Sequence, residues 1–276
     1  MTSAVERART RRRWSPFERY RRSLWLLTTR DLKVRYSTSA LGYVWSILDP
    51  LVMAAIYWFV FTQVFSRGVG AEPYIVFLLC GLLPWMWFTG AISDSTRAFT
   101  KEAKLIRSTT IPRTIWVARL VLSKGIEFLL AIPVLAIFVI ANLGERADGT
   151  PGAVLHVEAL WWLLAIPLQA GLTLGIGLLV APLVVFFRDL ERAVKLVLRF
   201  LFYASPIIYG LRDLGDLAFW GAFNPLAGIF SLYRSAFFPR ELDWFAVGIS
   251  AAMTVVFLVV GFLVYRGSIR RVLKEI

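Results

Sequence analysis

The residues that could do covalent chemistry in this sequence are few. An intramembrane hydrolase or transferase needs a nucleophile with a base, or a metal held by histidine and carboxylate ligands. The chain has one histidine, His156, in a predicted loop at 143–158 with no metal-ligand spacing around it. It also lacks a GxxxxGK(S/T) phosphate loop, the usual means of binding ATP. We therefore predict no catalytic residue, no metal site and no enzymatic activity in this chain.

Ionisable residues inside an apolar run could instead serve transport. Arg119, Lys124 and Glu127 lie in the apolar run 115–142, and intramembrane charges often mark ion or substrate pathways. Arg119 is close enough to the end of the run to snorkel to the interface. Lys124 and Glu127, at positions i and i+3, can pair along one helix face. Three interpretations of this pair stay open: a structural pair, a polar patch on a transport pathway, and a proton relay.

Aromatic side chains are the more abundant material for lining a pathway. Sugar rings stack on flat aromatic faces, so an aromatic channel would suit a carbohydrate chain. Aromatic residues also pack helices and form belts at membrane interfaces, which is the alternative interpretation. The candidate channel-lining residues from two apolar runs are Tyr57, Trp58, Phe61, Phe202 and Tyr203, together with the polar Lys124 and Glu127.

Long apolar runs must position these side chains. The chain has 276 residues, of which 58% are hydrophobic, more than one soluble core needs. Each run is close to the length that an apolar helix needs to cross hydrocarbon. We predict an all-α polytopic membrane protein with one transmembrane domain at 37–276 and six spans, at 44–65, 74–92, 115–142, 159–187, 193–209 and 244–265.

The basic residues explain the orientation. The net charge is +13, and 24 of the 31 Lys and Arg residues fall on one side of the six predicted spans. The positive-inside rule then places both termini in the cytoplasm. The membrane topology accounts for the net positive charge, so we predict no nucleic-acid partner.

The N-terminal region divides into a tail and a helix. Residues 1–14 form an Arg-rich tail that we expect to rest on anionic lipid. The segment 15–36 begins with Ser15, Pro16 and Glu18, a capping-box pattern. Apolar residues then recur at helical spacing against a basic face, which is typical of an amphipathic helix lying in the interface plane.

The region between spans five and six differs from the other outer loops. Its two apolar stretches, 217–223 and 226–238, are too short to cross a membrane and are separated by Asn224 and Pro225. We interpret them as two short re-entrant helices on the outer side, shielded by protein or by a water-filled pathway. The alternative is two helices lying passively in the outer headgroups.

Four blocks of residues, in register with the six spans, cover nearly the whole chain. They are Arg30-Asp31-Leu32-Lys33 with Arg35-Tyr36, Leu41-Gly42, Trp45 and Pro50; KEAKLIRSTTIPRTIWVAR at 101–119; Arg188-Asp189-Leu190 with Ser205-Pro206-Ile207-Ile208-Tyr209; and Asn224-Pro225-Leu226 with Arg234. In these blocks the sequence resembles the ABC-2 type permeases that export polysaccharides such as O-antigen, teichoic acid and actinobacterial galactan. Ser37 stands where that family usually has a basic residue.

The resemblance implies a homodimer bound to two separately encoded ATPase subunits, which would hold the ATP and Mg. It implies a coupling helix at 94–110 that docks into the ATPase, and outer gate helices at 211–240 that include Asn224, Pro225 and Arg234. The expected coupling residues are Arg30, Asp31, Lys101, Glu102, Leu105, Ile106 and Arg107. Leu105 and Ile106 are expected to enter a pocket of the ATPase.

The stretch from Arg30 to Leu51 is expected to act as a lever. Residues 37–42 form a joint where the chain turns into the membrane, with Gly42 and Pro50 as hinge positions. Asp49 lies near the inner boundary, where a carboxylate needs water or a cation beside it.

The expected cargo is a lipid-linked polysaccharide. Arg makes up 25 of the 31 basic residues, which favours a GC-rich source and an actinobacterial galactan. Two other functions stay open: an ABC-2 exporter of small lipids or drugs, and an ion-coupled secondary transporter.

Overall fold

A computed structural model of the chain describes residues 15–37, 42–60, 70–143 and 152–275. The predicted tail 1–14, most of the joint at 37–42 and the candidate channel residue Phe61 lie outside the described residues. Every regular element among the described residues is helical, so the all-α prediction is confirmed.

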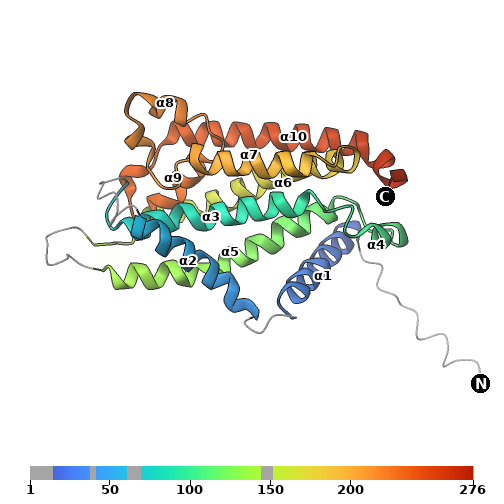
Figure 1. Cartoon of the computed structure of the whole chain (residues 1–276), viewed down its shortest axis with the longest axis horizontal. Coiled ribbons are helices and arrows are strands. Elements are labelled where there is room, and N and C mark those ends of the chain that lie inside the picture. Colours follow the sequence, from blue (N-terminus) through green and yellow to red (C-terminus); the bar gives the residue numbers. More distant parts are fainter. Residues whose placement is uncertain (1–14, 38–41, 61–69, 144–151, 276) are drawn as a thin grey trace, which may run out of the picture.

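Long helices run side by side along the molecule, and the N-terminal helix runs obliquely to them at one end (Figure 1). The helices that are long and apolar enough to cross a membrane are α3 (Tyr74–Ser95), α5 (Ile115–Ala141), α6 (Trp162–Phe186) with the 3₁₀ turn Val157–Trp161 before it, and α10 (Trp244–Glu275). They match four of the six predicted spans, and the all-α polytopic membrane fold is established. The complete count of six remains a prediction.

The first and fifth predicted spans appear as shorter helices. Helix α2 (Trp45–Trp58) follows a 3₁₀ turn at Gly42–Val44 and includes Pro50. Helix α7 covers only Leu190–Ala204, about 22 Å at the usual rise per residue. The predicted helix at 193–209 was therefore too long, because Ser205 precedes Pro206 and takes an extended conformation.

Helix α3 lies at the centre of the bundle. Nearly all of its side chains are buried, and its apolar residues point in every direction. A helix that is hydrophobic all round is expected in a core position. The neighbouring helices α5, α6 and α2 pack against it, so α3 is the axis around which the other spans are placed.

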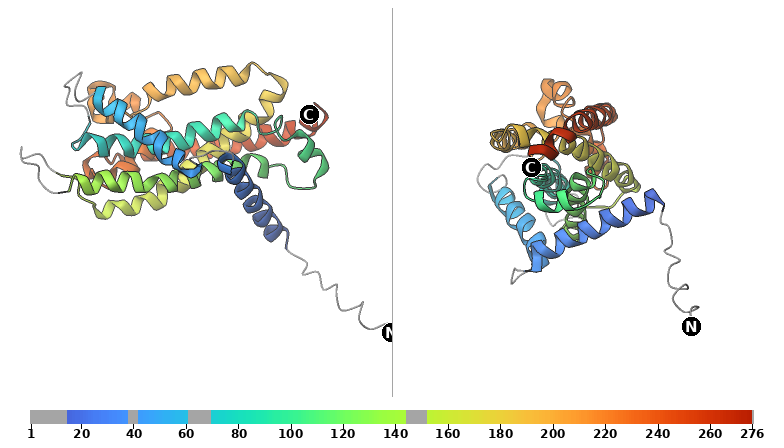
Figure 2. Two further views of the ribbon diagram at one scale, coloured as in Figure 1. Left: turned by 60° about the horizontal axis from the view of Figure 1, so that its bottom comes forward. Right: turned by 90° about the vertical axis from the view of Figure 1, so that its right-hand side faces the viewer.

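Helix α1 (Pro16–Ser37) runs across the bundle axis at the end that also holds α4 (Ala103–Ser108) and the C-terminus (Figures 1 and 2). We call this the α4 end. The predicted helix start is confirmed: the Ser15 N–H donates to Glu18 Oε2 at 2.8 Å, and the Glu18 N–H donates to Ser15 Oγ at 3.1 Å. One face of α1, including Leu27, Leu32 and Tyr36, is buried.

The opposite end of the bundle holds two short helices. Helix α8 (Ala218–Gly221) follows a 3₁₀ segment at Leu211–Leu217, and its Phe219 and Trp220 are exposed. Helix α9 (Ala227–Ser235) is buried along its whole length. The two predicted short helices are therefore present, but their environments differ.

Helices α6 and α10 pack closely through two glycines. A Cβ atom added at Gly261 would lie 2.1 Å from the backbone oxygen of Gly175, a distance that no side-chain carbon tolerates. Small residues that allow backbones to approach in this way are typical of membrane helix pairs.

We predict that Gly261→Ala lowers the unfolding free energy by about 2 kcal/mol, because the two backbones must separate. Thermal unfolding of the detergent-solubilised chain would measure the change. Gly267→Ala is the matched control, since its Cβ on the same helix would meet nothing within 4 Å. Equal stability of the two variants would contradict the packing argument.

Candidate functional site

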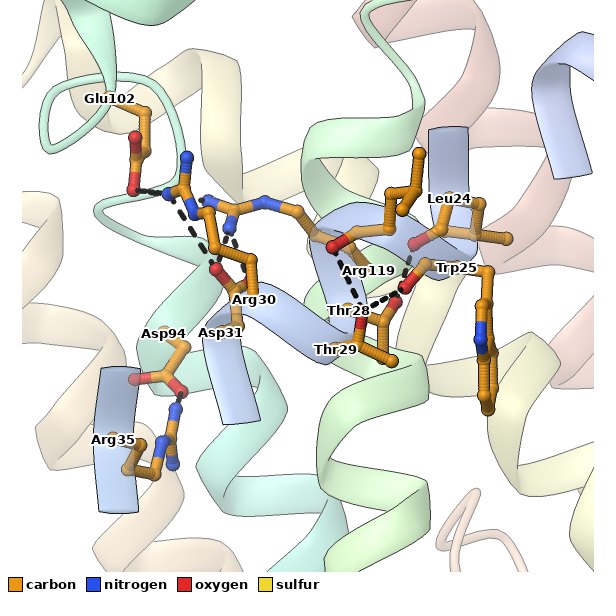
Figure 3. A network of polar contacts seen from close by, with 11 residues as sticks. Leu24, Trp25, Thr28, Thr29, Arg30, Asp31, Arg35, Asp94, Glu102 and Arg119 are labelled. Atoms are coloured by element: carbon orange, nitrogen blue, oxygen red, sulfur yellow. Dashed lines mark hydrogen bonds and ion pairs between the residues drawn. The ribbon is translucent and has the colours of Figure 1, made fainter. Parts of the chain in front are cut away.

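A cluster of four charged residues joins three elements at the α4 end (Figure 3). Arg119 of α5 makes an ion pair with Asp31 of α1. Arg30 of α1 donates to Glu102 at 2.5 Å, and Glu102 is also 3.9 Å from Arg119. We call Arg30, Asp31, Glu102 and Arg119 the α1 ionic cluster.

The environment of Arg119 differs from the one we predicted. Its side chain is only 3% exposed, so it does not snorkel to the interface. Its charge is instead compensated inside the protein by Asp31 and Glu102, which are 13% and 17% exposed. A buried ion is tolerated when it is paired in this way. The same contacts turn Asp31 and Glu102, expected to face an ATPase, toward Arg119, while Arg30 pairs with Glu102.

A second set of charges lies further along α1. Arg35 is held between Asp94 of α3 at 2.6 Å and Glu127 of α5 at 3.3 Å. Lys124 pairs with Glu127 at 2.6 Å, so the contact expected from their spacing is present. Because Arg35 joins the pair from another helix, Glu127 compensates two cations at once.

These groups border a cavity of about 360 Å³ beside the start of α2. We call it the hinge cavity, and its charged and Trp lining residues are Arg35, Trp45, Asp49, Trp87, Lys124 and Glu127. Asp49 is exposed at its edge. The expected need of Asp49 for water or a cation is consistent with its place beside this charged cavity.

The predicted coupling helix at 94–110 is not one helix. Asp94 and Ser95 end α3, residues 96–102 form turns, and only Ala103–Ser108 is helical as α4. Thr109 is extended, and the β-branched residues from Thr109 to Ile111 precede Pro112, which disfavours further helix.

The two apolar coupling residues face different environments. Ile106 is fully buried and packs in a cluster with Leu27, Ile115 and Trp116. Ile106 is therefore not available to another protein, contrary to our expectation. A helix as short as α4 is held in place by burying one apolar face against its own chain. Leu105 is partly exposed, and Lys101, Lys104 and Arg107 are exposed.

The turn before α4 is also tied to the start of α7. Arg97 donates to Glu191 at 2.9 Å through Nε, and Lys195 donates to the same oxygen at 2.8 Å. Hydrogen bonds from Arg97 and Lys195 lower the pKa of Glu191 to about 2. The carboxylate thus stays charged unless the pH falls to that value. Sequence reasoning missed this contact, since many charges in neighbouring loops could have paired.

Three of the predicted channel residues meet at a second cavity. The ring centroids of Tyr57 and Phe202 are 5.4 Å apart, and those of Phe202 and Tyr203 are 5.1 Å apart. Trp85, which sequence reasoning missed, lies 5.6 Å from Phe202. These four residues border a cavity of about 460 Å³ that also contacts Lys195 and Arg199. We call it the aromatic cavity.

The other predicted lining residues lie elsewhere. Trp58 is 41% exposed and borders neither cavity. Lys124 and Glu127 border the hinge cavity rather than the aromatic cavity. The structure therefore separates the aromatic candidates from the charged ones.

The residues assigned to an outer gate hold non-helical backbone in place. Arg234 is fully buried and donates to the carbonyls of Ile207 at 2.6 Å and Tyr209 at 3.1 Å. The Tyr74 hydroxyl donates to the carbonyl between them, that of Ile208, at 3.1 Å. Backbone outside a helix needs such partners when water is absent.

Asn224 and Pro225 mark the break between α8 and α9. The Asn224 side-chain amide donates to Ser205 Oγ at 2.9 Å, and its oxygen accepts from the Leu226 N–H at 2.9 Å. Pro225 follows directly and is partly buried. Asn224 therefore fixes the start of α9 to the end of α7.

The family model of ABC-2 type transporters matches residues 22–238, which include both cavities and both sets of charges. The chain belongs to the ABC-2 type transporter family. It is 34% identical over 245 residues to an O-antigen export system permease protein of Klebsiella pneumoniae, covering 87% of this chain and 89% of that protein.

Two further relatives cover similar shares. An O-antigen export system permease protein of Myxococcus xanthus is 28% identical over 247 residues, 87% of this chain and 89% of that protein. A polysialic acid transport protein of Escherichia coli is 27% identical over 256 residues, 91% and 95% of the two chains. This ABC-2 type chain is thus similar along almost its whole length to proteins named for O-antigen export and polysialic acid transport.

We predict that Asp31→Asn in this ABC-2 type chain lowers the unfolding free energy by about 3 kcal/mol, because Arg119 stays buried with less compensation. Chemical unfolding in detergent would measure the loss. The matched control is Arg97→Gln, which breaks an exposed pair and should change stability little. A loss no larger in Asp31→Asn than in the control would show that the α1 ionic cluster does not hold the α4 end together.

Proposed function

We propose that this chain is the permease subunit of an ATP-driven exporter that moves a lipid-linked polysaccharide out of the cytoplasm. The observation that carries the proposal is the α1 ionic cluster, which links the segment next to α4 to α1 and α5. A movement imposed on α4 by a partner would reach two helices through these contacts. The names of the relatives support a polysaccharide as cargo.

The partner in this proposal is a separately encoded ATPase subunit, which holds the ATP and Mg. It would contact the exposed side of α4, where Lys101, Lys104, Arg107 and part of Leu105 are accessible. With both termini and α4 in the cytoplasm of a bacterial inner-membrane protein, these cations lie on the side that the positive-inside rule favours. In this proposal the ion pairs of Arg30, Asp31 and Glu102 transmit a movement of α4 to α1 and α5.

The proposed channel lies between two copies of the chain. The helices α2 and α7 that border the aromatic cavity also carry exposed apolar side chains, since Ile56, Val197, Phe200 and Tyr203 are all at least half exposed. A second copy would close the cavity and cover this surface. Two copies of the permease would then require two ATPase subunits.

The lining of the aromatic cavity fits a carbohydrate chain. Tyr57, Trp85 and Phe202 offer ring faces, and Lys195 and Arg199 offer hydrogen-bond donors at one edge. Among polysaccharides we favour a galactan, because the preference for Arg over Lys suggests a GC-rich actinobacterial source. Small lipids or drugs are a second cargo class, for which a path with fewer aromatic residues would be expected.

An ion-coupled secondary transporter is the second candidate function. The observation that favours it is the set of partly buried charges Arg35, Lys124 and Glu127 at the hinge cavity. Such a transporter would move its cargo without any ATPase subunit. Export assayed with and without the co-expressed ATPase distinguishes the two functions, and export that persists without it would exclude our proposal.

We predict that Leu105→Ala reduces ATP hydrolysis and export by the purified complex severalfold while the permease stays as stable as the unaltered chain. Leu105 is the apolar side chain of α4 that a partner can reach. Hydrolysis and vesicle export should be measured together on complexes of equal composition.

Ile106→Ala is the matched control because Ile106 is buried in the chain's own core. It should lower the unfolding free energy by about 3 kcal/mol. If Leu105→Ala left hydrolysis, export and complex assembly all unchanged, α4 would not be the coupling element.

We predict that Gly42→Pro separates ATP hydrolysis from export. Gly42 has a φ of +48°, in the left-handed region, whereas proline fixes φ near −65°. The angle between α1 and α2 must therefore change. Export should fall at least tenfold, while hydrolysis and co-purification with the ATPase continue. Normal export by this variant would show that the joint is not part of the lever.

A further inference from the structure

Two cavities meet where α1 crosses α5, and of the cavities described above only the hinge cavity shares lining residues with them, Trp87 and Phe128. The first, here the head cavity, has a volume of about 420 Å³ and is bordered by Glu18, Arg21, Arg22, Leu24, Trp25 and Leu122. The second, here the apolar groove, has a volume of about 330 Å³ and lies between α5 and α6. Leu24 and Leu122 border both, so a cavity with charged side chains at its edge adjoins an apolar one.

The head cavity carries a net positive charge. Arg21 and Arg22 provide two guanidinium groups on the exposed side of α1. The one acid, Glu18, accepts a hydrogen bond from the Ser15 N–H at the helix start. Trp25 is 56% exposed beside them, and tryptophan favours the headgroup level of a membrane, where its ring is apolar and its N–H is polar.

The apolar groove has the chemistry of an acyl-chain site. Beyond Leu24 and Leu122 its walls include Ile126 and Leu129 of α5 and Ile166 of α6. From Ala118 to Leu129 the groove follows α5 for about 16 Å, about half the thickness of bilayer hydrocarbon. It therefore has the depth of one leaflet, with its charged opening at the α1 level.

We propose that the head cavity and the apolar groove together bind one anionic phospholipid of the leaflet in which α1 lies. The phosphate contacts Arg21 and Arg22, and one acyl chain lies in the groove between α5 and α6. Basic pockets beside membrane helices bind anionic headgroups in this way. A zwitterionic lipid would fill the groove equally well but would place its own cation among the arginines.

The position of the site favours a bilayer phospholipid over the exported lipid-linked molecule. The aromatic cavity lies against α2 and α7, whereas the groove is bordered by α5 and α6. Viewed along the bundle, α2 and α7 lie on one side and α6 on the other (Figure 2, right). A lipid in the groove would also contact α1 and α5 together, and would thus hold α1 at a fixed angle.

The test is lipid retention by the purified full-length chain, measured by native mass spectrometry with added phosphatidylglycerol or phosphatidylcholine of identical acyl chains. We expect phosphatidylglycerol to be retained at lower concentration. Arg21→Gln and Arg22→Gln should each weaken its binding about fivefold. Arg19→Gln is the matched control, an exposed arginine on the same helix that does not border the head cavity.

A second variant tests the groove. Ala170→Trp should fill it and reduce retention of both phospholipids, whereas Val256→Trp on the exposed face of α10 should not. Thermal unfolding without added lipid would show that each variant is folded. If Ala170→Trp does not fold, the comparison of Arg21→Gln and Arg22→Gln with Arg19→Gln still tests the proposal.

Four results would overturn the proposal. Equal retention of the two phospholipids would exclude recognition of the anionic headgroup. An equal effect of Arg19→Gln would mean that the basic surface attracts anions without a site. Displacement of phosphatidylglycerol by a polyprenyl pyrophosphate, with the same dependence on Arg21 and Arg22 and at lower concentration, would assign the site to the exported lipid. Displacement by glycerol phosphate alone at similar concentrations would show that the groove contributes nothing.

Discussion

The compensation of one buried cation organises the α4 end of this protein. Arg119 lies on α5, and its guanidinium is almost completely removed from solvent. A charge in that position is costly unless carboxylates approach it closely. Asp31 and Glu102 do so from two other parts of the chain. The requirement to neutralise Arg119 thus fixes α1 and the segment before α4 against α5.

Arg35 makes a second attachment of the same kind. It pairs with Asp94 and Glu127, so α1 is fastened at two places in its C-terminal half. A helix held at two points by ion pairs and by its buried apolar face moves as a rigid element. Its movement relative to α2 must then be taken up at the turn that begins with Gly42, whose left-handed backbone conformation is natural for glycine.

The opposite end of the bundle is held by hydrogen bonds to backbone. Three successive carbonyls after α7 are satisfied by Arg234 and Tyr74, which lets the chain leave helical conformation without leaving these carbonyls unpaired. Helix α9 is buried around this arrangement, whereas α8 presents exposed aromatic side chains. Of the two short helices, α8 is therefore the one at the surface, whereas Arg234 of α9 belongs to the buried part of the bundle.

The sequence by itself determined the features that depend on local pattern. Long apolar runs predicted α3, α5, α6 and α10, because the length and hydropathy of a membrane helix depend only on consecutive residues. Ser15 and Glu18 predicted the start of α1 in the same way, and four spaced motifs indicated the family. The i and i+3 spacing of Lys124 and Glu127 also sufficed to predict their contact.

The tertiary structure decided which residues far apart in the sequence contact each other and which are buried. Arg119 could have reached the interface, and its neutralisation by Asp31, 88 positions earlier, follows from how α1 packs across α5. Ile106 and Leu105 are adjacent and equally apolar, yet only packing determines that Ile106 faces the core. Ion pairs and burial are set by the three-dimensional arrangement of helices, which hydropathy and spacing along one chain do not contain.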